Sequence, residues 1–412
     1  MPETLSFTDD HAALQWLYET QMFGVKLGLG NVRKLLLAMD LPGQSQRFIH
    51  VAGTNGKGSV CAFAHQLLTT AGYTAGIFTS PHLVRFNERI RDGSRMISGS
   101  EIAEGLSRIR SVIECWDPHP TFFEITLALA LDWFRQRKVH YVVLETGLGG
   151  RMDATNVVHP VVSVITSIGM DHTEVLGDTL TQIAGEKAGI IKSGIPVVTG
   201  WQKPEVLGVL RDVAALEGAD FVEVSKPWQI SQPSLPGEHQ RQNAALAVAA
   251  VRAVGVEVGD DLCALALGRA YWPGRFQRFG VEGKLVIDGA HNTDSARALA
   301  KTWREVFADQ QAHILLGVVQ GKDLDGILAA LTPICAEWHV APFQSPRAIN
   351  PQEMEGRLRD TGRRIRVHKT LPTALQCLED LALPSLVAGS LFLAGEALNL
   401  LTGGQGFEPS WQ

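Results

Sequence analysis

Short apolar runs rich in valine and isoleucine recur along the first two thirds of the chain, and helix-like stretches separate them. They lie at 47–53, 75–80, 140–147, 160–169 and 195–200. Their apolar residues are continuous rather than alternating, which is typical of strands buried on both faces of a parallel sheet. We therefore predict a doubly wound α/β domain whose ligands lie at the carboxyl ends of the strands.

A second series of such runs follows Pro273, Gly274 and Gly280, which mark a natural break. We predict strands within 284–291, 313–319, 337–343 and 386–398, and an amphipathic helix over 293–307. The 412 residues suit two domains. The predicted fold is a P-loop-type, doubly wound, mostly parallel domain over 1–279, followed by a smaller Rossmann-like α/β domain over 280–412. Residues 226–243 are predicted to be a loop or linker, and the short segment at 221–238 leaves the edge of the first domain open.

The composition excludes several classes of protein. It is 45% hydrophobic and 19% charged, as in a folded chain, and the net charge is -6. With no basic cluster, we expect no nucleic-acid partner. The acidic N-terminus and the absence of a long apolar run predict neither a secretory signal nor a membrane partner. Five scattered cysteines without a C-x-x-C pair fit a reducing cytoplasm and argue against a zinc site or a disulfide framework.

The stretch HVAGTNGKGSV, residues 50–60, is a variant of a phosphate-binding loop. A strict P-loop has four residues between its glycines, whereas two separate Gly53 from Gly56. At a strand-to-helix turn, backbone N–H groups and the helix dipole attract an anion. Lys57 adds a charge for the outer phosphates, and Thr54 or Ser59 offers a hydroxyl. A glycine-rich turn without a ligand is the simpler interpretation, but the lysine after the strand favours a nucleotide; a dinucleotide fingerprint is absent.

Other polar residues follow predicted strands directly. Glu145 ends an apolar run, where it could ligate Mg²⁺ or cap a turn. Asp171 and His172 follow another run, and such a pair is more often part of a turn than a ligand. Lys187 lies in a helical stretch, where most lysines are simply solvated. In the second domain, Asp288, His291 and Asn292 again follow an apolar run.

Eight motifs in one order resemble the bacterial dihydrofolate synthase/folylpolyglutamate synthase family, a relative of the Mur peptide ligases. They are GTNGKGS, FTSPHLVRFNERI, TFFEI, LETGLGGRMDATN, SIGMDHTEVLG, GEKAGIIK, PGRFQ and IDGAHN. The resemblance runs from about residue 20 to 400. It implies an ATP-dependent amide ligase: ATP phosphorylates a carboxylate to an acyl phosphate, and the amine of L-glutamate displaces the phosphate. Such a reaction brings anions together, so positive groups must neutralise charge in a dry site.

The resemblance also assigns residues. It implies that ATP contacts Thr54, Asn55, Gly56, Lys57, Gly58, Ser59, Asn243, Arg275 and Asp288. It implies that Mg²⁺ is held by Ser80, Glu145, His172 and Lys187, the last as a carbamate formed with CO₂. The pterin substrate is expected at Thr121, Phe122, Phe123, Glu124, Met152, Asp153 and Ala154, with the loop at 24–28 in the place of another pterin contact. Catalytic roles are implied for Lys57, Lys187, Asp288 and His291.

Four functions compete at this point. The favoured one is a bifunctional ligase that makes dihydrofolate and then extends the glutamate tail of reduced folates. The others are a monofunctional folylpolyglutamate synthase, a Mur-type cell-wall ligase and a non-catalytic nucleotide-binding protein. Only about 50 residues precede the loop, which leaves no room for the UDP-binding domain of a cell-wall ligase. We expect a cytoplasmic monomer that acts on small molecules.

Overall fold

The computed structural model describes residues 6–23, 28–43, 45–404 and 406–408. The chain divides into two compact units. Unit 1 comprises residues 1–81, 87–233 and 241–270, and unit 2 comprises 82–86, 234–240 and 271–412. The second unit therefore begins at Tyr271 and takes in two short segments from earlier in the chain.

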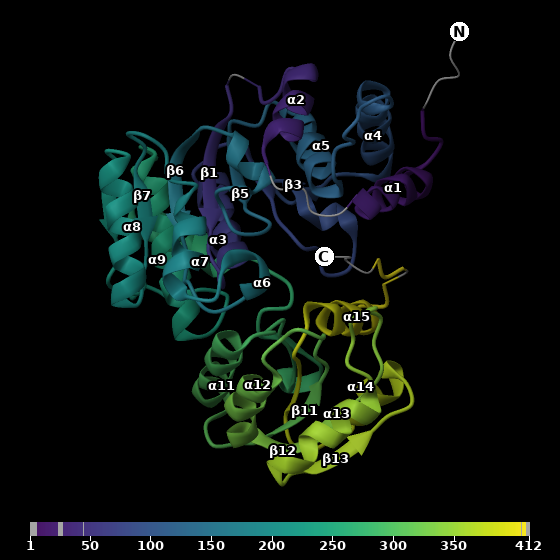
Figure 1. Ribbon diagram of the computed structural model, residues 1–412. Coiled ribbons are helices and arrows are strands. Elements are labelled where there is room, and N and C mark those ends of the chain that lie inside the picture. Colours follow the sequence, from purple (N-terminus) through teal and green to yellow (C-terminus); the bar gives the residue numbers. More distant parts are fainter. Residues whose placement is uncertain (1–5, 24–27, 44, 405, 409–412) are drawn as a thin grey trace. The chain divides into compact units, whose positions relative to one another are not determined.

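Unit 1 is built on a sheet in the order β4-β3-β2-β5-β1-β6-β7-β8. The six neighbouring strands β2, β5, β1, β6, β7 and β8 pair in parallel. At one edge of the sheet, β3 pairs antiparallel with both β2 and β4. Figure 1 shows β1 in the interior of this sheet, next to β5 and β6. The strands are β1 (Arg47–Ala52), β2 (Ala75–Phe78), β3 (Ile90–Asp92), β4 (Arg95–Met96), β5 (Tyr141–Glu145), β6 (Pro160–Ile165), β7 (Val197–Thr199) and β8 (Phe221–Glu223).

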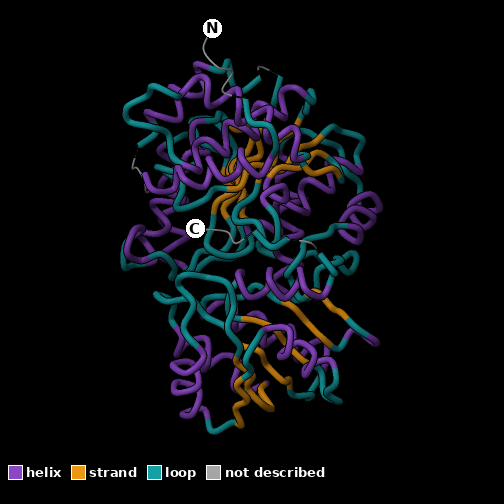
Figure 2. The backbone as a smooth tube through the Cα atoms, turned by 90° about the vertical axis from the view of Figure 1, so that its right-hand side faces the viewer, coloured by secondary structure: helices purple, strands orange, loops and turns teal. Residues whose placement is uncertain are grey.

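Helices surround this sheet, as Figure 2 shows. Helix α3 lies against β1, β2 and β5, and α10 packs on α3. Helices α7 and α8 bury apolar residues against β1, β6 and β7. The helices are α1 (Asp10–Glu19), α2 (Gly30–Ala38), α3 (Lys57–Thr70), α4 (Gly99–Ile113), α5 (Phe122–Gln136), α6 (Thr173–Leu176), α7 (Leu180–Ala188), α8 (Pro204–Leu216), α9 (Glu238–Ala253) and α10 (Asp260–Arg269).

Unit 2 has its own sheet, in the order β13-β12-β11-β14-β10-β9. Only β9 pairs antiparallel among its described strands. The strands are β9 (Gln277–Phe279), β10 (Leu285–Ile287), β11 (Ala312–Leu316), β12 (Cys335–Val340), β13 (Arg364–Val367) and β14 (Ser385–Ala388). The helices are α11 (Thr293–Phe307), α12 (Leu324–Leu331), α13 (Pro351–Leu358), α14 (Leu371–Glu379) and α15 (Leu391–Leu401).

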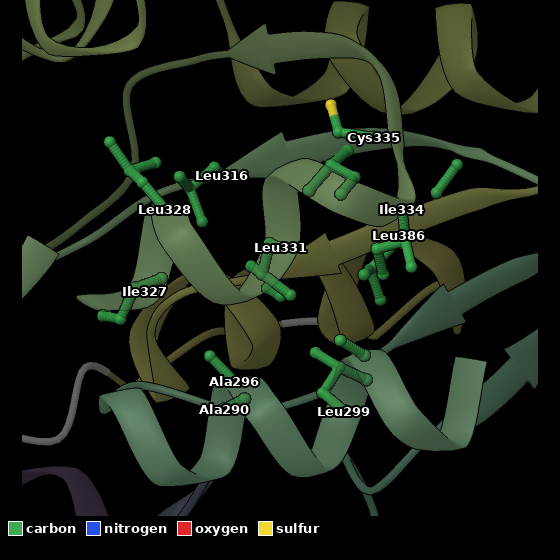
Figure 3. Close-up of a cluster of buried hydrophobic side chains, with 14 of the residues drawn as sticks. Ala290, Ala296, Leu299, Leu316, Ile327, Leu328, Leu331, Ile334, Cys335 and Leu386 are labelled. Carbon is green, nitrogen blue, oxygen red and sulfur yellow. The ribbon is translucent and has the colours of Figure 1, made fainter. Parts of the chain in front are cut away.

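Apolar clusters cover both faces of the second sheet. One cluster joins the strands to α11, α12 and α13, and the other joins them to α14 and α15. Figure 3 shows part of the first, with Leu299 of α11, Leu331 of α12 and Leu386 of β14. Burial on both faces explains why the strands are continuous apolar runs. The predicted fold class, two doubly wound and mostly parallel α/β arrangements, is confirmed.

Two sequence predictions are wrong in part. Residues 386–398 were predicted as a strand, but the strand ends at Ala388 and α15 begins at Leu391 after the N-cap Ser390. Residues 226–243 were predicted as a loop, yet α9 begins at Glu238. In both places short-range composition was a poor guide, because a buried helix and a buried strand are equally apolar, and polar residues also begin helices. The strands β3, β4, β8, β9 and β13 were not predicted.

Within the described residues, no helix combines the length and the apolar character that crossing a membrane requires.

Candidate nucleotide and metal site

The glycine-rich loop joins the carboxyl end of β1 to α3, which begins at Lys57. Gly56 is the N-cap, with a φ of 89° that favours glycine. The backbone N–H groups of Thr54 and Asn55 donate to the carbonyl of Ser167, at 2.8 and 3.3 Å, which ties the loop to the segment after β6. The first turn of α3 points its N–H groups, which have no intrahelical acceptor, away from the helix. The loop therefore has the geometry of an anion-binding turn.

Close packing fixes this turn. A Cβ on Gly53 would come within 1.8 Å of Thr166 Oγ1, and a Cβ on Gly56 within 2.6 Å of Asn243 Oδ1. Asn243 lies on α9, so the fold brings its amide onto the loop from far along the chain. Because β1 lies between β5 and β6, the strand ends on either side of the loop share one edge of the sheet. That edge is where doubly wound folds bind ligands.

Two lysines donate hydrogen bonds to backbone carbonyl groups of the loop. The Nζ of Lys57 donates to the carbonyl oxygens of Gly53 and Thr54, at 3.1 and 3.3 Å. The Nζ of Lys187 donates to the carbonyl of Gly53 at 2.9 Å. Lys187 is buried, and this burial, together with the charge of Lys57, lowers its pKa to about 7, against the opposing effect of Asp171 and Asp153. The simpler interpretation of Lys187 as a solvated lysine is wrong.

Oxygen groups gather at the ends of β2 and β5. The carboxylate of Glu145 accepts a hydrogen bond from the backbone N–H of Ser80, at 3.2 Å. The hydroxyls of Ser80 and Thr146 are buried and have no hydrogen-bond partner among the described residues. Hydroxyl and carboxylate oxygens are the ligands that Mg²⁺ prefers. His172 lies in the segment after β6 and is the N-cap residue of α6. One of its ring nitrogens is 4.0 Å from Asp171 and the other is 3.9 Å from Glu174.

The remaining predicted nucleotide and catalytic residues lie in unit 2. The Asp288 carboxylate, after β10, accepts from the backbone N–H groups of Phe276 and Ala290, both at 2.8 Å. Burial raises the pKa of Asp288, and the charge of Arg275 opposes this shift. The Nδ1 of His291 lies 2.8 Å from the carbonyl oxygen of Gly289. Arg275, Asp288 and His291 thus belong to one short region around the end of β10.

Comparisons with known proteins match both units. The Mur ligase middle domain matches residues 51–197, and the Mur ligase glutamate ligase domain matches 274–391. The dihydrofolate synthase/folylpolyglutamate synthase of Bacillus subtilis is 38% identical over 83% of this chain and 87% of its own length. The corresponding Escherichia coli protein is 33% identical over 83% of each chain. This chain belongs to the Mur ligase family, in its dihydrofolate synthase/folylpolyglutamate synthase branch.

Solved structures of the branch agree. E. coli FolC in complex with DHPP and ADP has a TM-score of 0.84 and 31% identity, covering 95% of this chain and 98% of that one. The Mycobacterium tuberculosis folylpolyglutamate synthase complexed with ADP and AMPPCP has a TM-score of 0.86 and 30% identity, covering 97% of this chain and 100% of that one. The family resemblance seen in the motifs is confirmed.

The expected pterin residues of this Mur ligase begin α5. Thr121 and Glu124 form a capping box, in which each side chain bonds the backbone N–H of the other. Phe122 stacks on Tyr18 with ring centroids 5.6 Å apart. The Phe123 ring lies 5.8 Å from that of Phe78, and a Cβ on Gly147 would come within 2.8 Å of it. Phe123 thus reaches the sheet edge that carries Glu145, whereas Thr121 and Glu124 already have structural partners.

Among the other expected pterin residues, Asp153 also has structural partners. The buried Asp153 accepts from the backbone N–H groups of Leu148 and Thr155, at 2.8 and 3.0 Å, and burial raises its pKa against these bonds. It therefore holds its own loop together. Met152 is exposed, and Ala154 begins a short 3-10 turn. In the predicted 24–28 loop, residues 24–27 lie outside the described residues.

Three further residues at this site carried no predicted role. Thr146 follows Glu145 directly, and its strand-end position is the signal that could have singled it out. Asp171 raises the pKa of Lys187 against the effect of burial. Arg89 is buried, with its guanidinium 5.4 Å from the Phe122 ring centroid, and burial lowers its pKa to about 10. No sequence pattern singled out Arg89 as a buried residue, because arginines are usually exposed.

Proposed function

We propose that this protein is a bifunctional ATP-dependent ligase. It adds L-glutamate to dihydropteroate, giving dihydrofolate, and to the glutamate tail of reduced folates. The observation that carries the proposal is the anion-binding turn at Gly53–Ser59, which lies at the same sheet edge as the carboxylate of Glu145. The relatives named above, which include enzymes of both activities, support it.

The residues at this edge fit ATP and Mg²⁺. The hydroxyls of Ser80 and Thr146 are buried without a partner among the described residues, which suits groups whose partner is a ligand. We assign Mg²⁺ to Ser80, Glu145 and His172, and the phosphates to the backbone of Gly56 and Gly58 and to the side chains of Lys57 and Ser59. The backbone N–H groups of Thr54 and Asn55 already donate to Ser167, so these two residues are proposed to contact the nucleotide through other atoms. When bound, Mg²⁺ neutralises phosphate charge.

The chain's own groups then account for the first chemical step. A substrate carboxylate attacks the γ-phosphate of ATP, which yields an acyl phosphate and ADP. Lys57 and the N-terminal turn of α3 supply fixed positive charge for the phosphate oxygens, without reorganisation of solvent. Asn243, packed over Gly56, holds the turn in shape and can contact the nucleotide. The amine of glutamate then displaces phosphate and forms the amide.

We assign the glutamate-adding part of the reaction to unit 2. Asp288 and His291 are its proposed catalytic residues, and Arg275 and Asp288 its proposed nucleotide contacts. The support is their clustering after β10 and the match of residues 274–391 to a glutamate ligase domain. The pterin is assigned to Phe122, Phe123 and Met152, and to the backbone at Thr121, Glu124, Asp153 and Ala154, because the side chains of Thr121, Glu124 and Asp153 have structural partners.

Lys187 is proposed to react with CO₂ and to serve as a metal ligand. Its pKa of about 7 means that much of the amine is neutral near pH 7, the form whose nitrogen attacks the carbon of CO₂ with release of a proton. The product is an anionic carbamate, whose oxygens are hard ligands suited to Mg²⁺. Replacing a buried cation beside Lys57 by an anion also relieves the repulsion between the two lysines.

We further propose a cytoplasmic monomer without a nucleic-acid or membrane partner. All five cysteines are free, and three of them are buried thiols that suit a reducing compartment. The net charge of -6 disfavours phosphate backbones. Light scattering coupled to size-exclusion chromatography should give the mass of one chain, and the mass of a dimer would refute the monomer.

Two assays test the function. ADP release is measured with dihydropteroate plus glutamate, and separately with a reduced folate plus glutamate. We expect glutamate-dependent release in both. Release with the reduced folate alone would leave a monofunctional folylpolyglutamate synthase, and release in neither assay would favour a nucleotide-binding protein without ligase activity.

A further inference from the structure

Three residues of unit 2 present metal-binding atoms to one another on one face of its sheet. His313 lies on β11, and Glu337 and His339 lie on β12. His313 pairs directly with Glu337 across the two parallel strands, and His339 lies two residues further along β12. Because side chains two apart in a strand share a face, all three point to the side of the sheet that α14 and α15 cover.

The distances between these atoms match a zinc coordination shell. His313 Nδ1 lies 3.3 Å from His339 Nε2 and 3.4 Å from Glu337 Oε2, and the same oxygen lies 3.7 Å from His339 Nε2. Ligands about 2.0–2.1 Å from a tetrahedral Zn²⁺ are about 3.4 Å apart. Direct hydrogen bonds between such groups are usually about 2.7–3.2 Å long. The triangle formed by His313 Nδ1, Glu337 Oε2 and His339 Nε2 is therefore wider than hydrogen bonding requires. It has the size of one face of the zinc tetrahedron.

Neighbouring groups orient the three candidate ligands. The Nδ1 of His339 lies 2.9 Å from Nε2 of His368, a hydrogen bond that can hold His339 as the tautomer with its Nε2 lone pair facing His313. Glu337 turns its other oxygen, Oε1, towards Arg366, at 3.6 Å. Metal-binding imidazoles and carboxylates commonly have outer partners of this kind.

Burial and charge suit a metal ligand set. His339 is fully buried, while His313 and Glu337 are 13% and 15% exposed, so two of the three candidate ligands remain in contact with solvent. Burial lowers the pKa of His339 to about 3 and also lowers that of His313. The uncharged imidazole is the form that binds a metal, so burial favours the ligating form of both rings.

We propose that His313, Glu337 and His339 form a site for a divalent transition metal, with zinc as the ion it fits best. Two imidazoles and one carboxylate are an established zinc ligand set. An ion here would join β11 to β12 and stabilise unit 2, since it binds the folded state. The cysteine pattern argued against zinc, but this site uses no cysteine.

A second grouping, His339, His368 and Cys377, shares one histidine with the first. Its two histidine nitrogens are only 2.9 Å apart, which is a hydrogen-bond length, and Cys377 Sγ lies 3.2 Å from Nη1 of Arg366. Two ligands of one tetrahedral zinc are further apart. We therefore assign His368 to the outer shell and leave Cys377 out of the site.

Cobalt titration tests the site. The full-length, chelator-treated protein is titrated with Co²⁺ in excess Mg²⁺, which occupies oxygen-rich sites but competes poorly for imidazole nitrogen. We expect one ion per chain with the strong visible absorption of tetrahedral Co²⁺ and its displacement by Zn²⁺. His313→Ala and Glu337→Gln should abolish this binding, and His368→Ala should weaken it about 10- to 100-fold.

The exposed His159 of unit 1 provides the control, because His159→Ala removes an imidazole without touching the cluster. Metal-free melting curves establish that each variant is folded. Zn²⁺ should raise the melting midpoint of the wild type and His159→Ala fully, that of His368→Ala less, and those of His313→Ala and Glu337→Gln not at all. Wild-type protein without stoichiometric Co²⁺ binding, or binding that survives in both ligand variants, would overturn the site. A thiolate-to-metal charge-transfer band would also overturn it, since Cys377 would then be a ligand.

Discussion

Lys187 and Lys57 donate hydrogen bonds to the same acceptor, the carbonyl oxygen of Gly53, at 2.9 and 3.1 Å. Two lysine nitrogens on one oxygen are stable only if one of them is easily deprotonated or a negative charge lies nearby. Both conditions hold, because the pKa of Lys187 is lowered to about 7 and Asp171 and Asp153 act on it. The carbonyl of Gly53 therefore joins the phosphate loop to the one lysine for which we propose a chemical modification.

Removing the Lys57 charge should abolish most turnover. For Lys57→Ala we expect kcat to fall by about 10²- to 10³-fold, the usual effect of losing one preorganised charge donor. The melting midpoint should change little, because each lost hydrogen bond contributes only about 1 kcal/mol. Lys203→Ala, at an exposed position with no side-chain cap bond, is the matched control. Near-normal turnover of a folded Lys57→Ala protein would refute the phosphate role.

Gly56 and Gly72 form a natural pair for testing the loop. Their φ angles are 89° and 88°, but a Cβ on Gly56 would meet Asn243 whereas one on Gly72 would meet nothing within 4 Å. Gly72→Ala therefore measures only the cost of positive φ, about 1–2 kcal/mol. Gly56→Ala should be more destabilising and should also weaken ADP binding. Equal unfolding free energies and unchanged ADP affinity would show that Asn243 does not constrain the turn.

Loss of Lys187 should nearly abolish activity in both glutamate-adding assays. If a carbamate supplies the ligand, a small added carboxylate should partly restore Lys187→Ala, and exhaustive removal of CO₂ should inactivate the wild type. Lys192→Ala, a half-buried lysine nearby on the chain, is the control and should remain active. A fully active Lys187→Ala protein would end the proposal.

Lys187 also predicts how stability depends on pH. Its pKa is about 7 in the folded protein and about 10.4 in an unfolded chain, so between these values the unfolded state binds the extra proton. The contribution of Lys187 to the free energy of unfolding therefore rises from pH 7 to pH 10 and is lowest below pH 7. In CO₂-free buffer, Lys187→Met should stabilise the protein most at pH 6. Urea unfolding that gives the same difference at pH 6 and pH 9 would contradict a lowered pKa.

Thr121 separates a structural from a substrate role. Thr121→Ala removes the α5 cap and should cost about 1 kcal/mol, whereas Thr121→Ser keeps the hydroxyl that caps the helix. If the side chain only caps α5, Thr121→Ser should match the wild type in melting midpoint and in KM for dihydropteroate. A raised KM in a serine variant of normal stability would instead place the threonine methyl against the substrate.

The sequence alone determined the features that depend on neighbours along the chain. Continuous apolar runs predicted strands β1, β2, β5, β6 and β7, and the amphipathic pattern at 293–307 predicted α11 with its observed bounds. The loop at 53–59 was recognisable because a strand, glycines and a helix must follow one another for an anion to meet N–H groups. These features are local, so the order of residues specifies them.

Tertiary structure decided what depends on desolvation and on contacts between distant segments. Asn243 reaches Gly56 only because α9 folds back onto the loop, and Lys187 has a pKa of about 7 only because packing excludes water from its amine. Likewise, His313 and His339 become a candidate metal site only when β11 and β12 pair in register. Burial and register are properties of the assembled sheets, since the same residues in a solvated segment would be an ordinary lysine and ordinary histidines.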